Sequence, residues 1–262
     1  MPTTYTHNFF GKVVYQKLPE EIQELITRNK MAYLIGQHGP DILFYYRPFC
    51  ENRINRLGHQ MHEESATDFF SRCKAAYRQS GDEVLLVYTI GYICHYMLDS
   101  TCNPYIEQYT QRTGAGNDEI ESELDRILME KSGKNPFSHR PADDLRGNRA
   151  LLKAITVAYE DVTEQQIRKC LKAMRFYTGL TVCRNAFKRK ALLGCMRCGR
   201  IYKKVQGRVI RKKRLKRCEE STKELLAMLR VMVPETVTVI EEFYQTLSEE
   251  EYLNYRFERN YK

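Results

Sequence analysis

The sequence predicts an all-α protein. Apolar residues recur at the three-to-four-residue spacing of amphipathic helices along most of the chain, and no convincing stretch alternates apolar and polar residues as a half-buried strand would. The longest apolar stretch, residues 83–98, is long for a strand and therefore favours a buried central helix. A chain of 262 residues can bury a sizeable core, so we expect a single helical domain over residues 1–262.

Short helices joined by a loop are predicted before this central helix. Pro19 stands in the first turn of the first of them, where its missing N–H costs little. A short loop is expected over residues 36–41. Residues 55–79 then continue with apolar side chains at helical spacing, which predicts further helix up to the central one.

Three more helices are predicted after the central one. The first begins just after the Gly-Ala-Gly break at 114–116, and a loop rich in Gly, Pro, Ser and Asn follows it over residues 131–148. Thr163 opens a capping box for the second. The third is a long helix over residues 219–247, in which Pro234 is expected to introduce a kink or a break.

Charge is distributed unevenly along the chain. The chain carries +9, but residues 184–217 contain 15 Lys or Arg and no Asp or Glu, so the rest carries −6. We expect this segment to be a basic insertion or arm that contacts anionic phosphate, either on a membrane surface or on nucleic acid. A solvated insertion without a partner is the alternative. The predicted contact residues are Lys203, Lys204, Arg211, Lys212, Lys213 and Arg214.

The cysteines and the apolar runs bear on location. Nine cysteines are an odd number without regular spacing, and no run of apolar residues has the length of a signal peptide or a membrane span. This excludes a disulfide-stapled scaffold and predicts a cytoplasmic protein with free thiols. Cys195 and Cys198 form one close pair, whereas a four-cysteine zinc site usually needs two.

Four short motifs carry residue types that bind metal ions: Thr6-His7, Gly39-Pro40-Asp41, Gly58-x-x-x-His62 and His95-x-x-x-Asp99. The last is the most informative, because positions i and i+4 share one face of a helix. Burying Asp99 on the most apolar helix without a partner would cost several kcal/mol, so it needs a metal ion or a strong donor. A hydrogen-bonded polar pair in the core is the alternative. For Asp41 the alternative is an N-cap, and His59 could serve in place of His62.

These motifs, in this order, resemble the zinc-dependent phospholipase C family over about residues 5–130, which would form the metal-site half of the chain, residues 1–130. The resemblance implies a helical bundle around up to three zinc ions. It makes Asp41, His62, His95 and Asp99 the ligands of one ion. Asp99 would bridge to a second ion held by His7 and, as in the family, by the amino group of the mature chain, for which Pro2 is the candidate here. It further implies that the protein hydrolyses a phosphodiester, with phospholipids among the candidate substrates. Asp41 and Asp99 would orient the attacking water or accept its proton.

The chain departs from the family at the third zinc site. Two histidine ligands are replaced by Tyr105 and Asn117, which leaves only Glu121. Zinc is almost always held by at least three protein groups, so we expect two ions rather than three and a lower turnover. A non-catalytic descendant that binds a metal or a lipid headgroup, and a nuclease-like phosphodiesterase, are the alternatives. No obligate protein partner is inferred.

Several of these residues have plainer interpretations. Asn117 could be the N-cap of the helix that follows it, which would leave Glu121 a surface residue. Cys102, seven residues after His95 and on the same face, could supply a substitute thiolate ligand. His38 and His139 are expected to be surface or loop histidines.

Overall fold

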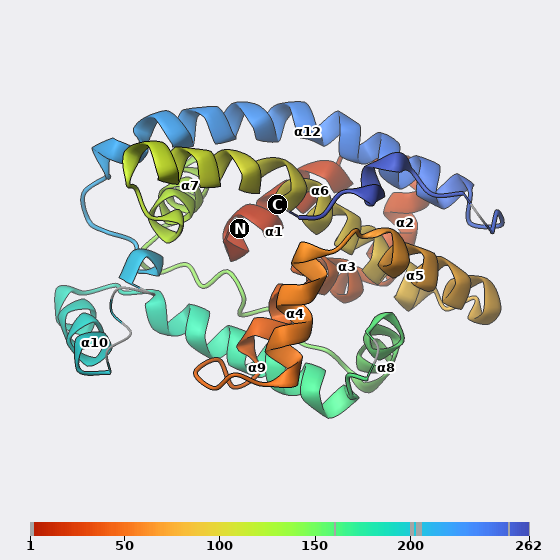
Figure 1. Ribbon diagram of the computed structural model, residues 1–262, viewed down its shortest axis with the longest axis horizontal. Coiled ribbons are helices and arrows are strands. Elements are labelled where there is room, and N and C mark those ends of the chain that lie inside the picture. The colour runs from red at the N-terminus through yellow and green to blue at the C-terminus, as the bar shows by residue number, and fades with distance from the viewer. Residues whose placement is uncertain (1–2, 160, 200–201, 203–205, 251, 262) are drawn as a thin grey trace.

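The computed structural model describes residues 3–159, 161–199, 202, 206–250 and 252–261, and these residues form helices and connecting turns without a strand (Figure 1). The predicted all-α fold is therefore confirmed. The α-helices are α1 Thr4–Tyr15, α2 Glu20–Arg28, α3 Lys30–Gly36, α4 Arg53–Glu63, α5 Thr67–Ser80, α6 Glu83–Thr113, α7 Asn117–Lys131, α8 Arg149–Ala158, α9 Glu164–Thr181, α10 Ala186–Cys198 and α12 Glu219–Gln245. Short 3-10 helices are η1 Gly39–Tyr45, η2 Gln206–Arg208, η3 Lys216–Cys218 and η4 Tyr255–Glu258.

Helix α6 forms the centre of the molecule. Asp82 caps its start by accepting hydrogen bonds from two backbone N–H groups, and Gly114, with a φ of 68°, ends it in the left-handed region that favours glycine. The helix is longer than the predicted range of 83–98 and passes through Pro104. Buried residues such as Cys102 and Ile106 continue its apolar surface, so packing outweighs the hydrogen bond that the proline removes.

Two glycines bring α3 into direct contact with α6. A Cβ atom on Gly36 would lie 2.2 Å from the carbonyl oxygen of Tyr88, and one on Gly91 would lie 2.4 Å from that of Tyr33. The two backbones can approach this closely only because both positions lack a side chain. The turn after α3 is thereby held against the face of α6 that carries His95.

Helix α12 lies along α6 and α7 on one side of the molecule, and α9 lies on the opposite side (Figure 1). The sequence predicted a kink or break in α12 at Pro234, yet the helix is assigned without interruption from end to end. Leu229, Met232 and Thr236 remain buried on both sides of the proline, so core packing maintains the helix. Residues 55–79, predicted as continuous helix, are instead divided between α4 and α5 by a short turn.

Residues 186–198 of the basic segment 184–217 form α10, a helix that the sequence did not predict. Cys183, Met196 and Val209 form a small apolar cluster separate from the main core. The segment after α10 docks on the acidic helix α7 through arginines spaced three residues apart. The ion pairs are Arg208 with Asp118, Arg211 with Glu119, Arg214 with Glu130 and Arg217 with Glu119.

All nine cysteines are free thiols. Within the described ranges, every helix is too short or too polar to cross a lipid bilayer.

Candidate metal centre

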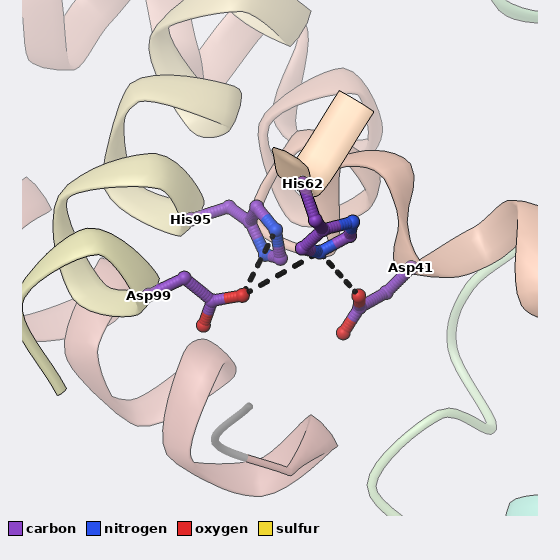
Figure 2. Close-up of side chains that lie close together, drawn as sticks. All are labelled: Asp41, His62, His95 and Asp99. Atoms are coloured by element: carbon purple, nitrogen blue, oxygen red, sulfur yellow. Dashed lines mark ion pairs between the residues drawn. The ribbon is translucent and has the colours of Figure 1, made fainter. Parts of the chain in front are cut away.

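Four side chains from three elements meet beside α6. Asp41 comes from η1, His62 from α4, and His95 and Asp99 from α6, and each offers one ligand atom within 4.8 Å of the others. Figure 2 shows the two imidazoles and the two carboxylates turned toward one another. The Nε2 atom of His62 lies 3.2 Å from an oxygen of Asp41 and 3.7 Å from one of Asp99. Residues 41, 62, 95 and 99 are thus brought together, although 58 residues separate the first from the last.

His95 and Asp99 lie one turn apart on α6. Their Nε2 and Oδ2 atoms are 3.5 Å apart, and both side chains are fully buried. Neither ring nitrogen of His95 and neither carboxylate oxygen of Asp99 has a hydrogen-bond partner. Buried polar atoms are almost always hydrogen-bonded, so this set of unpartnered donor atoms is the arrangement that a metal ion would satisfy.

His62 is oriented by its own helix. Its Nδ1 atom lies 2.6 Å from the carbonyl oxygen of Gly58, so an Nδ1–H would donate there and leave Nε2 directed at Asp41 and Asp99. Metal-binding histidines usually donate their second ring nitrogen in this way, which sets the tautomer. Asn52 caps α4 by accepting two backbone hydrogen bonds and so determines where the helix begins.

His7 approaches the same carboxylate from the other side. Its Nε2 atom lies 3.4 Å from Oδ1 of Asp99, and its ring stacks on His95 with centroids 4.6 Å apart. The first turn of α1 is anchored by Asp125 of α7, which accepts hydrogen bonds from the backbone N–H and the hydroxyl of Thr6 at 2.8 and 2.6 Å. Asp99 therefore has one oxygen toward His7 and the other toward His62 and His95, as a bridging ligand would.

The ionisable groups of the cluster shift one another's pKa values. Burial opposes the protonation of His62, but Asp41 and Asp99 outweigh it and raise its pKa to about 10. Burial would raise the pKa of each carboxyl group, yet the neighbouring histidines hold both pKa values below their usual range. Burial lowers the pKa of His95 to about 4 in spite of Asp99. Without an ion, both carboxylates are therefore negatively charged at neutral pH and the ring of His62 carries an additional proton. A bound cation would displace that proton.

The donor chemistry fits zinc. Zinc binds imidazole nitrogen and carboxylate oxygen, usually with four ligands, and two of each are gathered here. Three of the four side chains are almost inaccessible, whereas Asp41 keeps 17% of its side chain exposed. Access from solvent is therefore greatest beside Asp41.

The residues expected at a third metal site have other partners. The ring of Tyr105 lies 5.9 Å from that of Tyr109, and Asn117 accepts a hydrogen bond of 2.5 Å from the hydroxyl of Thr110. Glu121 is buried rather than on the surface, and burial raises its pKa to about 7. Within the described part of the chain, none of these residues belongs to a second group of three or more metal-binding side chains.

The N-cap interpretations of Asn117 and Asp41 are wrong. Gly116 precedes the first helical residue of α7, and its N–H donates to the carboxylate of Glu119 at 3.2 Å. Asn117 is itself the first residue of the helix. Asp41 lies inside the first turn of η1, where His38 occupies the N-cap position.

His38 is buried, which the sequence did not predict. Its ring lies 6.1 Å from that of His7, its Nε2 atom has no hydrogen-bond partner, and burial lowers its pKa to about 3. The contact of α3 with α6 carries this turn inward, and no local sequence pattern indicates such a contact. His59 is exposed beside Phe44, outside the cluster, and His139 is half-buried in the loop after α7.

Two other residues near the cluster differ in their roles. Cys102 is completely buried, and burial raises the pKa of its thiol to about 12, which disfavours a thiolate ligand. Tyr261 covers the cluster from the C-terminal segment, with its ring 4.9 Å from that of His62 and its N–H bonded to the carbonyl oxygen of His62. Its position near the end of the chain offered no signal of this contact.

The predicted contact residues of the basic segment differ in their surroundings. Arg211 and Arg214 are paired with α7, as described above. Lys212 and Lys213 are exposed, and Lys203 and Lys204 lie outside the described residues. Cys195 and Cys198 are exposed, and they too belong to no gathered group of metal-binding side chains within the described ranges.

Comparison with known proteins gives one match. The model of a family described as zinc dependent phospholipase C matches residues 6–169, which is more than half of the chain. The match includes His7 and all four residues of the cluster. No curated protein and no solved structure matches the chain.

Proposed function

The chain belongs to the zinc-dependent phospholipase C family, and on this basis we propose that it is a metal-dependent phosphodiester hydrolase that acts on phospholipid-type substrates. The observation that carries the proposal is the convergence of Asp41, His62, His95 and Asp99. The atoms with which they face one another are buried and lack hydrogen-bond partners. In a purely structural polar cluster, these atoms would be expected to form hydrogen bonds with other groups of the protein.

The roles of Asp99 and Asp41 would differ because their exposure to solvent differs. Asp99, wholly buried and in contact with His7, His62 and His95, would hold the metal site together. Asp41, the most accessible of the four ligands, would face the substrate, orient the attacking water and accept its proton together with Asp99. When bound, zinc polarises a phosphoryl oxygen and makes water a nucleophile at neutral pH.

We further propose two ions rather than three. One would be held by the four-residue cluster. The second would be held by His7, with Asp99 as the shared ligand, and by the amino group of Pro2, which lies outside the described residues. In two-metal hydrolases the pair of ions stabilises the attacking and the leaving oxygen, and this is the chemistry that two bound ions would supply here. The different partners of Tyr105 and Asn117 support the absence of a third ion.

The test combines metal analysis with an assay. The purified protein is analysed for zinc by mass spectrometry and assayed with a chromogenic phosphocholine diester. We expect one to two zinc ions per chain and measurable hydrolysis. Replacing His62 by glutamine should reduce both, with the activity falling at least about 100-fold. Replacing His59, which is exposed on the same helix, by glutamine is the matched control and should change neither. Less than one metal ion per chain without hydrolysis under added zinc would refute the proposal.

A non-catalytic metal-binding protein is the second candidate, and the replaced residues Tyr105 and Asn117 favour it. The variant Tyr105→His/Asn117→His separates the two candidates. If the wild-type protein binds zinc without hydrolysis and the variant gains activity, the chain is a decayed enzyme. If neither protein hydrolyses the diester although both bind zinc, only the binding role stands.

A further inference from the structure

Several large apolar side chains stand exposed on α9, on α10 and in the loop before α4. Phe49, in the loop between η1 and α4, is 63% exposed, Phe176 on α9 is 60% exposed, and Phe187 on α10 is 83% exposed. Leu180, one turn after Phe176 on α9, is also exposed. Isolated exposed apolar residues need no explanation, but a contiguous group marks an interaction site.

Contacts hold the three segments that carry these residues against one another. The ring of Tyr177 lies 5.6 Å from that of Phe49 and 5.1 Å from that of Phe176. Lys188 donates hydrogen bonds to two backbone carbonyl groups at the end of α9, at 3.3 and 2.6 Å. This anchors the start of α10, and with it the neighbouring Phe187, beside the last turn of α9. We call the four exposed residues Phe49, Phe176, Leu180 and Phe187 the apolar surface.

Unpaired cations lie on the same segments as the apolar surface. They lie in the η1–α4 loop, on α9, and on or beside α10, all are exposed, and none forms an ion pair within the described ranges: Arg47, Lys172, Arg184 and Lys190. By contrast, the arginines of residues 208–217 that face α7 are paired with its carboxylates. The basic segment therefore divides into a part that binds the protein itself and a part whose charge faces solvent.

Exposed apolar side chains with unpaired cations on the same segments match the boundary of an anionic bilayer. Apolar groups there enter the acyl region, while Lys and Arg contact the headgroups. Nucleic acid would use the cations and could stack bases on aromatic rings, but an exposed leucine offers bases no stacking face. The apolar surface also begins in the loop that directly follows η1, which carries Asp41, the most accessible residue of the metal cluster.

We propose that the apolar surface and these unpaired cations dock the protein on an anionic phospholipid bilayer. The proposal deepens the proposed function, because it identifies where a hydrolase of this kind would meet a substrate held in a membrane. Docking does not itself require hydrolysis, so the two proposals can fail separately.

Vesicle flotation tests the apolar part. The zinc-loaded protein is mixed with vesicles of phosphatidylcholine containing phosphatidylserine, and the bound fraction is measured. The variant Phe176→Ser/Phe187→Ser should bind at least roughly tenfold more weakly, because two rings no longer enter the interface. Val231→Ser is the matched control, since Val231 is an exposed apolar residue on α12, away from this surface, and it should bind as the wild-type protein does.

Charge reversal tests the cationic part. Arg184→Glu/Lys190→Glu should weaken binding by more than roughly tenfold, since each cation near an anionic membrane contributes about a fivefold factor. The control Lys223→Glu/Arg230→Glu reverses two exposed charges on α12 and should have a smaller effect. Binding of the wild-type protein should fall when phosphatidylserine is omitted or salt is added.

The outcomes separate docking from catalysis. All of these variants should hydrolyse a soluble diester at the wild-type rate, because none alters the metal cluster. Wild-type protein that hydrolyses the soluble diester but does not float with anionic vesicles overturns the docking proposal alone. Vesicle binding without hydrolysis supports docking and refutes the proposed function. Tighter binding to a single-stranded oligonucleotide that is lost in the same variants would identify a nucleic-acid surface and overturn docking on lipid.

Discussion

Removing the metal should lower the melting temperature by roughly 8–16 °C. The ion would tie together α4, η1 and α6, and only the folded state assembles its ligands. A ligand present at about 1,000 times its dissociation constant stabilises the folded state by about 4 kcal/mol. For a domain of this size, each kcal/mol corresponds to roughly 2–4 °C of melting temperature, which gives the expected range.

Thermal unfolding followed by circular dichroism at pH 7 measures this shift. The protein is melted with a chelator and again with zinc at about 1,000 times the dissociation constant obtained by titration. His95→Gln should lose most of the response to zinc, because it removes a buried ligand, whereas His59→Gln should respond as the wild-type protein does. A wild-type shift below about 2 °C, with zinc binding demonstrated, would show that the cluster is not where the ion binds.

Three further predictions concern pH, backbone geometry and the basic segment. Burial disfavours the proton on His62, but the neighbouring carboxylates raise the pKa of His62 to about 10. The charge of His62 therefore stabilises the metal-free fold fully below pH 6.5, and this contribution is lost as the pH rises toward 10. Urea unfolding of chelated protein should show that decline, and His62→Gln should lack it. Gly39→Ala should weaken zinc binding at least roughly tenfold in a metal titration, because the new Cβ would lie 2.2 Å from the ring of His95. The control is Gly114→Ala, since Gly114 also has a left-handed backbone but no atom near its Cβ position, and it should leave the affinity unchanged. Glu119→Gln should lower the free energy of unfolding by about 1–2 kcal/mol, because two arginines lose their buried partner, and added salt should reduce the difference.

The part of the site that lies on one helix followed from periodicity alone. A spacing of four residues places His95 and Asp99 on the same face of any helix, and their 3.5 Å separation agrees. Asp41 and His62 carry no such local signal, because their approach depends on how α3, η1 and α4 pack. Only the resemblance to a family suggested that they belong to the same site.

Features that depend on long-range packing were not predictable. Pro104 and Pro234 would interrupt isolated helices, but burial on both sides of each proline keeps α6 and α12 continuous. The burial of His38 follows from two glycines, Gly36 and Gly91, that touch across different helices. Periodicity within one segment contains no information about such a contact.

The ion pairs with α7 also change how the basic segment should be studied. Glu119 of α7 is buried and bonded to two arginines of the segment. Deleting residues 184–217 would leave this buried carboxylate without those cations, at a cost of several kcal/mol, in the helix whose Asp125 anchors the start of α1. Loss of lipid or nucleic-acid binding after such a deletion could therefore arise from damage to the fold. Charge reversal at Arg184 and Lys190, which have no partner in the described part of the chain, avoids this ambiguity, so point variants are the informative test of what the segment binds.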